Sequence, residues 1–182
     1  MKIFVETERL ILREILLSDA KKMFELDSDP EVHRFLGDDP VKSIDQITDA
    51  IQFIRKQYID NGVGRWAVVS KSTNEFIGWA GLKFVTEMTN HRKNYYDLGY
   101  RLIRKHWGKG YATEAAFASL KYAFEKIGTA EVFAMAETEN INSINILKKS
   151  GFRWIEKFDL EGIEHLWFQI KKTDFESQSA KK

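Results

Sequence analysis

The chain has 182 residues, 43% of them hydrophobic and 30% charged, and a formal net charge of only +1, which excludes a strong overall attraction to nucleic acid or a membrane surface. It contains no cysteine, which excludes a disulfide framework and a thiol nucleophile, and its four histidines are too scattered to suggest a metal site. No apolar run is long enough to span a bilayer, and the first residues become charged too early for a secretory signal, so we expect a cytoplasmic protein.

The length suits one domain, expected over residues 1–174, with a disordered tail over 175–182. A strand at 10–15 precedes a helix at 18–26, capped by Ser18 and Asp19, and a second helix that Ser43 caps and Gly62 ends. Strands at 65–70, 75–85 and 95–103 lead to a long helix at 110–127. A strand at 130–136, a short helix at 142–150 and a hairpin of 152–158 and 163–171 complete the chain. Three consecutive strands before the long helix imply a mixed sheet flanked by helices, an α/β fold of the mixed α+β kind.

A basic, glycine-containing turn joins the strand at 95–103 to the long helix. Arg104, Lys105 and His106 lead into the segment Trp107–Ala112, which contains Gly108, Lys109 and Gly110. The first N–H groups of a helix lack internal partners, and glycine lets a ligand approach them, so the turn indicates a phosphate site. A surface turn with solvated lysines is the alternative.

Two common nucleotide motifs fail at this turn. A Walker loop needs Ser or Thr after Gly-Lys and an earlier glycine, but Gly110 follows Lys109 and Ile103 stands at the earlier position. A dinucleotide fingerprint needs Gly or Ala at its last position, where this chain has Thr113.

A polar cluster opens the short helix after the strand at 130–136. Asn140 or Asn142 is expected to cap this helix, and Gly151 to end it. Capping accounts for these residues individually, but not for a polar cluster beside the first site.

In chain order, these stretches and two others resemble the GNAT superfamily of N-acetyltransferases, most closely its ribosomal-protein-alanine (RimJ/RimL-like) branch. The matching segments are Thr7–Arg13, Leu98–Leu102, Trp107–Ala115 and Asn140–Phe152. The resemblance implies a mostly antiparallel sheet splayed between its fourth and fifth strands. It also implies acetyl-CoA as cosubstrate, without a metal, with pantetheine lying in the splay.

The resemblance also implies which residues bind coenzyme A. The backbone of Leu102 and Ile103 would pair with pantetheine. Asn140 and Ser143 would face pantetheine and the thioester sulfur. The pyrophosphate would bind at the basic turn, to which Lys105 belongs. The N–H groups that bind it would be those of Trp107, Gly108, Lys109, Gly110, Tyr111 and Ala112.

The catalytic residues are less clearly marked. Many superfamily members have, where this chain has Leu147, a tyrosine that acts as the acid and protonates the leaving thiolate. Ser143 is expected to donate a hydrogen bond to the leaving sulfur instead. Asp97 is expected to help deprotonate the acceptor through water, with Glu137 as the reserve. A cross-strand ion pair is an equal alternative for Asp97, and a bond to the backbone is the alternative for Ser143.

The expected reaction is acetyl transfer from acetyl-CoA to a primary amine, with the α-amine of a peptide or protein favoured. An α-amine has a pKa of about 7.7–8.0 and a lysine side chain one of about 10.4, so the α-amine needs the weaker base. A non-catalytic acyl-CoA sensor and an acetyltransferase for a polyamine or antibiotic are the alternatives. We expect no nucleic-acid or membrane partner, and either a monomer or a homodimer.

Overall fold

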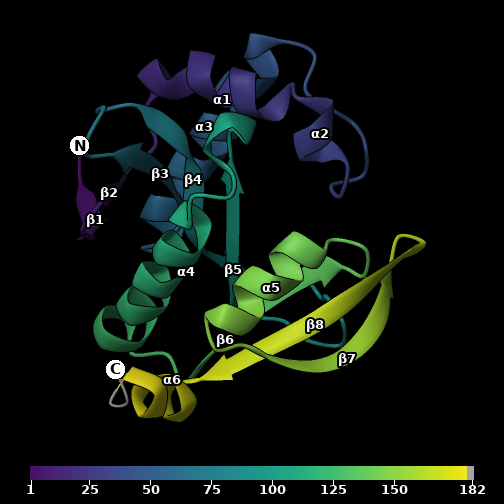
Figure 1. Ribbon diagram of the computed structural model, residues 1–182. Helices are drawn as coiled ribbons and strands as arrows, with labels where there is room; N and C mark the ends of the chain where they lie inside the picture. Colours follow the sequence, from purple (N-terminus) through teal and green to yellow (C-terminus); the bar gives the residue numbers. More distant parts are fainter. Residues whose placement is uncertain (180–182) are drawn as a thin grey trace.

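One eight-stranded sheet runs through residues 1–179, the part of the chain that the computed structural model describes (Figure 1). Its order is β1-β2-β3-β4-β5-β6-β8-β7, and all neighbours are antiparallel except the parallel pair β5 and β6. The sequence-based prediction of a mixed, mostly antiparallel sheet is therefore confirmed. The strands are β1 (Ile3–Glu6), β2 (Leu10–Arg13), β3 (Arg65–Ser70), β4 (Phe76–Val85), β5 (Tyr95–Leu102), β6 (Glu131–Glu137), β7 (Arg153–Leu160) and β8 (Ile163–Lys171).

The sheet opens between β5 and β6. Within the described chain these strands match in register only at Asp97 and Phe133, whereas β4 and β5 match along the whole of β4 except its first two residues. Beyond Asp97, β5 therefore runs on without β6 beside it. The opening lies between the fourth and fifth predicted strands, as expected.

Helices cover both faces of the sheet (Figure 1). On one face, α1, α2 and α3 enclose a core that includes Ile15, Ala67 and Phe76. On the other face, α4, α5 and α6 pack over β4, β5, β6 and β8. The helices are α1 (Ala20–Asp27), α2 (Pro30–His33), α3 (Ile44–Asp60), α4 (Tyr111–Tyr122), α5 (Ile141–Lys149) and α6 (Lys172–Ser179).

The long helix α4 brings its N-terminus to the end of β5. Its side chains Ala115 and Ala116, and Ala123 directly after it, are fully buried, and such small residues let a helix lie close to a sheet. The predicted helix at 110–127 comprises α4 and one π turn, Ala123–Ile127, in which the Gly128 N–H donates to the Ala123 carbonyl at 2.9 Å. The basic turn is thereby held at the opening of the sheet.

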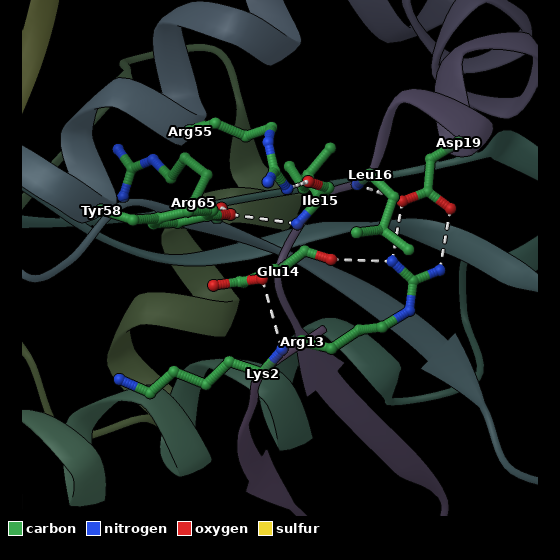
Figure 2. A network of polar contacts seen from close by, with 9 residues as sticks. All are labelled: Lys2, Arg13, Glu14, Ile15, Leu16, Asp19, Arg55, Tyr58 and Arg65. Carbon is green, nitrogen blue, oxygen red and sulfur yellow. Dashed lines mark hydrogen bonds and ion pairs between the residues drawn. The ribbon is translucent and has the colours of Figure 1, made fainter.

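A polar network fixes the start of β3 (Figure 2). The Tyr58 hydroxyl of α3 donates to the Arg65 carbonyl and accepts the Ile15 N–H at 3.1 Å. Arg55 donates from Nη1 to the Ile15 carbonyl at 2.9 Å. These bonds tie α3 to the segment after β2 and set the position from which the Arg65 side chain extends into the sheet.

The prediction that Ser18 and Asp19 cap the first helix holds only in part. A 3₁₀ turn, Leu17–Asp19, precedes α1, and the Asp19 side chain bonds to the backbone at the start of that turn rather than to the first turn of α1. The buried Asp19 carboxylate instead accepts from Arg13 at 2.7 and 2.8 Å and from the Leu16 N–H at 2.8 Å (Figure 2). Arginine competes well for a carboxylate because both partners are charged.

The prediction of a disordered tail is wrong for residues 175–179, which lie in α6. Phe175 is 4% exposed, and its ring centroid lies 4.9 Å from that of Phe117 and 5.2 Å from that of Phe124. One buried aromatic anchors an otherwise polar helix. Residues 180–182, also part of the predicted tail, lie outside the described residues.

Candidate active site

Two hollows meet at the opening between β5 and β6. The larger has a volume of about 710 Å³ and lies among α2, the end of β5, the start of α4, and α5. The smaller, of about 200 Å³, reaches Asp97, Glu137 and His165. Their shared wall consists of Phe35, Leu36, Tyr100, Arg101, Asn140 and Ser143.

The basic turn forms one end of the larger hollow. Gly108 and Gly110 have φ angles of +73° and +79°, in the left-handed region that glycine adopts without strain. The N–H of Glu114 makes the first helical bond, to the Gly110 carbonyl at 3.0 Å, so the preceding N–H groups of the first turn have no helical acceptor. Gly108, Gly110, Tyr111 and Ala112 all line this end, as does Thr113.

The other residues predicted in the turn fit the site less well. Lys105 and Lys109 are outside the lining, and the Nζ atom of Lys105 lies 4.0 Å from a Glu75 carboxylate oxygen. The side chain of Trp107 lines the hollow, but its backbone N–H donates to the Arg104 carbonyl at 3.0 Å. Lys149 of α5, which the sequence did not single out, does line the hollow.

Of the two residues expected to pair with pantetheine, only Leu102 faces the larger hollow. Its carbonyl accepts the Trp107 indole N–H at 2.7 Å. Ile103 donates its N–H to the Ile77 carbonyl at 3.0 Å and accepts the His106 N–H at 2.9 Å. The strand neighbour thus takes the Ile103 N–H, and the following turn already donates one hydrogen bond to its carbonyl.

Asn140 and Ser143 stand on the shared wall. Asn140 caps α5 by accepting the Ser143 N–H at 3.1 Å, which confirms the predicted cap. The Ser143 hydroxyl lies 2.9 Å from the Tyr100 hydroxyl of β5, which also donates to the Ser143 backbone carbonyl at 3.1 Å. Burial raises the pKa of Tyr100, and the bond to Ser143 only partly offsets this, so the phenol stays protonated at neutral pH.

Asp97 lies on the face of β5 opposite to that of Tyr100, and it lines the smaller hollow. Its carboxylate forms a buried ion pair with Arg65 of β3, which also donates to the Asp97 carbonyl at 2.7 Å. Burial raises the pKa of Asp97, although Arg65 acts in the opposite direction. The ion pair considered as an alternative for Asp97 is therefore present, beside the hollow in which a base was expected.

Glu137, the reserve base, ends β6 and also lines the smaller hollow. It lies opposite His165 of β8, whose Nδ1 atom is 2.9 Å from the Ile163 carbonyl. The structure thus brings Asp97, Glu137 and Ser143 to one hollow.

The sequence reasoning missed Tyr100, Arg65 and Arg101. Tyr100 and Arg101 belong to the segment Leu98–Leu102 and could have been assigned by strand alternation, which places them on opposite faces. Arg101 donates to the buried Asp27 at 2.5 Å, across the face that α1 covers. Arg65 lies far from Asp97 in sequence, and no local pattern marks it.

Two further observations concern residues 1–179. No helix there is long and apolar enough to cross a membrane. No cluster of three or more His, Cys, Asp or Glu side chains in that range is arranged to hold a metal ion.

Comparisons with known proteins agree with this geometry. Residues 9–153 match the sequence profile of the acetyltransferase (GNAT) domain. The uncharacterized N-acetyltransferase p20 of Bacillus licheniformis is 34% identical over 147 residues, covering 81% of this chain and 80% of that protein.

Two solved structures have the same fold. A ribosomal-protein-S5-alanine acetyltransferase from Vibrio fischeri superposes with a TM-score of 0.75 at 18% identity, covering 94% of this chain and 97% of that one. A spermidine N-acetyltransferase from Vibrio cholerae, in complex with CoA and spermine, superposes with a TM-score of 0.74 at 19% identity, covering 93% and 99%.

Proposed function

The chain belongs to the GNAT family of acetyltransferases and is an acetyl-CoA-dependent acyltransferase, and from this premise we propose that it acetylates the free α-amine of a peptide or protein. The observation that carries the proposal is the meeting of the two hollows at Tyr100, Asn140 and Ser143. A donor in the larger hollow and an acceptor in the smaller one would meet at this wall.

The larger hollow fits coenzyme A. Its end at the basic turn offers N–H groups of Gly108, Gly110, Tyr111 and Ala112 to the pyrophosphate, as expected of a helix N-terminus. Leu102 and Asn140 line the path from there toward the smaller hollow. Ser143, on the shared wall, is placed where we assign the thioester sulfur.

In the reaction, the neutral amine attacks the acetyl carbonyl carbon, a C–N bond forms and the C–S bond breaks. The amine gives up one proton and the departing thiolate takes one. We assign the first proton to Asp97, acting through water, because its carboxylate is the buried one in the smaller hollow and burial raises its pKa. Glu137, on the opposite wall, is the reserve.

Ser143 is assigned to the leaving sulfur. The Tyr100 phenol remains protonated, and its single proton has two acceptors within reach, the Ser143 carbonyl and the Ser143 hydroxyl. When it donates to the hydroxyl, the serine proton is left for the thiolate. Leu147, at the position of the familiar tyrosine acid, is 1% exposed and belongs to the core. A hydroxyl pair on the shared wall thus takes the place of that tyrosine.

The charges of the smaller hollow favour an α-amine over a polyamine. Arg65 and Arg101 both line it, and each forms an ion pair with one carboxylate. Glu137 is then the carboxylate of this lining that forms no ion pair with a described residue. A polycation would bind better to a hollow with several unpaired carboxylates. A lysine acceptor would need roughly 3 kcal/mol more for deprotonation than an α-amine.

The acceptor is tested with matched peptides at fixed acetyl-CoA. One peptide has a free N-terminus and no lysine, and its partner has the same sequence with a blocked N-terminus and one lysine. We expect kcat/KM, followed by thiol release, to favour the free N-terminus by about ten-fold or more, equivalent to about 1.4 kcal/mol.

Spermidine serves as the polyamine arm, and mass spectrometry locates the acetyl group on each product. A preference of about ten-fold for the blocked lysine peptide or for spermidine would overturn the α-amine assignment while leaving the acetyltransferase intact. A protein that binds acetyl-CoA but releases no thiol with any acceptor would act as a sensor instead.

A further inference from the structure

The turn between β1 and β2, although distant in sequence, contacts the start of α4. Arg9 donates from Nη1 to the Lys109 carbonyl at 3.0 Å, in the middle of the basic turn. Its guanidinium carbon also lies 4.6 Å from the ring centroid of Tyr111. Arg9 itself is outside the lining of the larger hollow, so it contacts the turn from behind.

This contact fixes one peptide plane. In a trans peptide, the carbonyl of Lys109 and the N–H of Gly110 point in opposite directions. Arg9 holds the carbonyl on its own side, and this directs the Gly110 N–H away from Arg9. Gly108 and Gly110 line the hollow whereas Lys109 does not, so this N–H is directed to the side where we assign the pyrophosphate. With glycine on both sides of Lys109, the peptide has little other restraint.

Glu114, in the first turn of α4, orients Arg9. Its carboxylate accepts from the Arg9 Nε at 2.6 Å, from the Arg9 backbone N–H at 3.1 Å and from the Thr7 hydroxyl at 2.5 Å, while Nη2 of Arg9 lies 2.6 Å from it. Partial burial raises the pKa of Glu114, but the bonds from Thr7 and Arg9 outweigh it and hold that pKa below its usual value. The carboxylate is therefore ionised at neutral pH, and its Oε2 atom, in contact with both Nε and Nη2 of Arg9, fixes a side chain that is itself 44% exposed.

We propose that Arg9, oriented by Glu114, is a positioning residue that holds the Lys109–Gly110 peptide so that the turn presents its N–H groups to the donor's pyrophosphate. The inference rests on the proposed binding of acetyl-CoA at this turn. The inference gives the segment Thr7–Arg9 a role in donor binding, although this segment lies outside the larger hollow.

The test compares two acyl donors, acetyl-CoA and S-acetylpantetheine, of which only the first carries a pyrophosphate. In Arg9→Gln and Arg9→Lys, we expect the KM for acetyl-CoA to rise by about ten-fold, the worth of one ordinary hydrogen bond, with kcat nearly unchanged. The kcat/KM for S-acetylpantetheine should stay at the wild-type value. Lysine keeps the charge, but its ammonium group cannot bond to the Glu114 carboxylate and the Lys109 carbonyl at the same time, as the planar guanidinium does.

Two controls accompany these variants. Arg153→Gln removes an exposed arginine whose partner is Asp174, and should change neither donor. Gly110→Val places a branched side chain at a φ of +79°, with its Cβ 3.4 Å from Arg9 Nη2, and should abolish the advantage of acetyl-CoA over S-acetylpantetheine.

The outcomes separate the two levels of the argument. An unchanged KM for acetyl-CoA in both Arg9 variants, with a loss in Gly110→Val, would overturn the role of Arg9 alone. An equal loss with both donors would make Arg9 a purely structural residue. Wild-type protein that uses both donors equally well would overturn the assignment of the turn to pyrophosphate, and this inference with it.

Discussion

At the scale of single residues, Asp97 combines two opposing influences. Burial raises its pKa above the ordinary 3.8, and Arg65 acts to lower it. A base must be ionised, so activity that depends on Asp97 should be lost as the pH falls through this raised pKa. For Asp97→Asn we expect kcat/KM at pH 7 to fall by about ten- to a hundred-fold. The acid limb assigned to Asp97 should disappear from the pH profile, and the loss should shrink at higher pH, where the amine is neutral without help.

Asparagine keeps the volume of Asp97 and can still accept a bond from Arg65, so thermal unfolding of the variant checks that the fold persists. Glu137→Gln is the matched variant on the opposite wall and should have the smaller effect. Normal kcat and an unshifted pH profile in Asp97→Asn would leave the carboxylate with only its ion pair.

The hydroxyl of Ser143 takes no part in capping α5. Asn140 accepts the backbone N–H of Ser143, whereas the Ser143 hydroxyl meets the Tyr100 hydroxyl at 2.9 Å. Removing it in Ser143→Ala should lower kcat by about ten-fold, the effect of losing one hydrogen bond to a charged group, without a matching rise in the KM for acetyl-CoA. Steady-state kinetics with the preferred acceptor measures both constants.

Ser119→Ala provides the comparison, because Ser119 is a fully buried serine that bonds the Ala115 carbonyl within α4, away from both hollows. Its kcat should match the wild type. Full kcat in Ser143→Ala would reduce Ser143 to a structural residue of the helix start.

At the scale of elements, the parts with a local physical signal were predictable. Ser43 accepts the Gln46 N–H and caps α3, as expected from a small polar residue before an apolar repeat of helical spacing. The turn before α4 was marked by two glycines and a basic cluster. The opening between β5 and β6 was implied by the resemblance to the GNAT superfamily, which rests on the ordered set of segments rather than on any one strand.

Elements that depend on distant partners were not predictable. β1 has no interior burial pattern of its own and gains its place by pairing with β2. α2 does have local signals, since Asp29 accepts the Glu31 N–H and Pro30 stands at its first turn, but its four residues are too few to show a helical repeat. The same limit applies to the site: Arg65 reaches Asp97 across β4, and Arg9 reaches Lys109 from the other end of the chain.

At the scale of the molecule, the shared wall of the two hollows and the buried contacts of α6 lie on different parts of one structure. The core around α4 extends to the C-terminal helix, where Phe175 packs with Phe117 and Phe124. The larger hollow lies at the other end of α4, at its N-terminus. Stability and chemistry should therefore respond to different substitutions, which gives a test of the arrangement as a whole.

Phe175→Ala should lower the free energy of unfolding by about 3 kcal/mol, because it removes a buried ring and leaves a cavity in the core. Urea denaturation measures the loss, which is a large share of the roughly 5–15 kcal/mol that stabilises a typical domain. At a temperature where the variant is fully folded, its kcat and its KM for acetyl-CoA should match the wild type. Glu176→Ala, one position along the same helix at an exposed ion pair of 3.9 Å, should leave stability nearly unchanged. A Phe175→Ala protein of wild-type stability would mean that α6 does not complete the core, and the original expectation of an unstructured tail would then hold for residues 175–179.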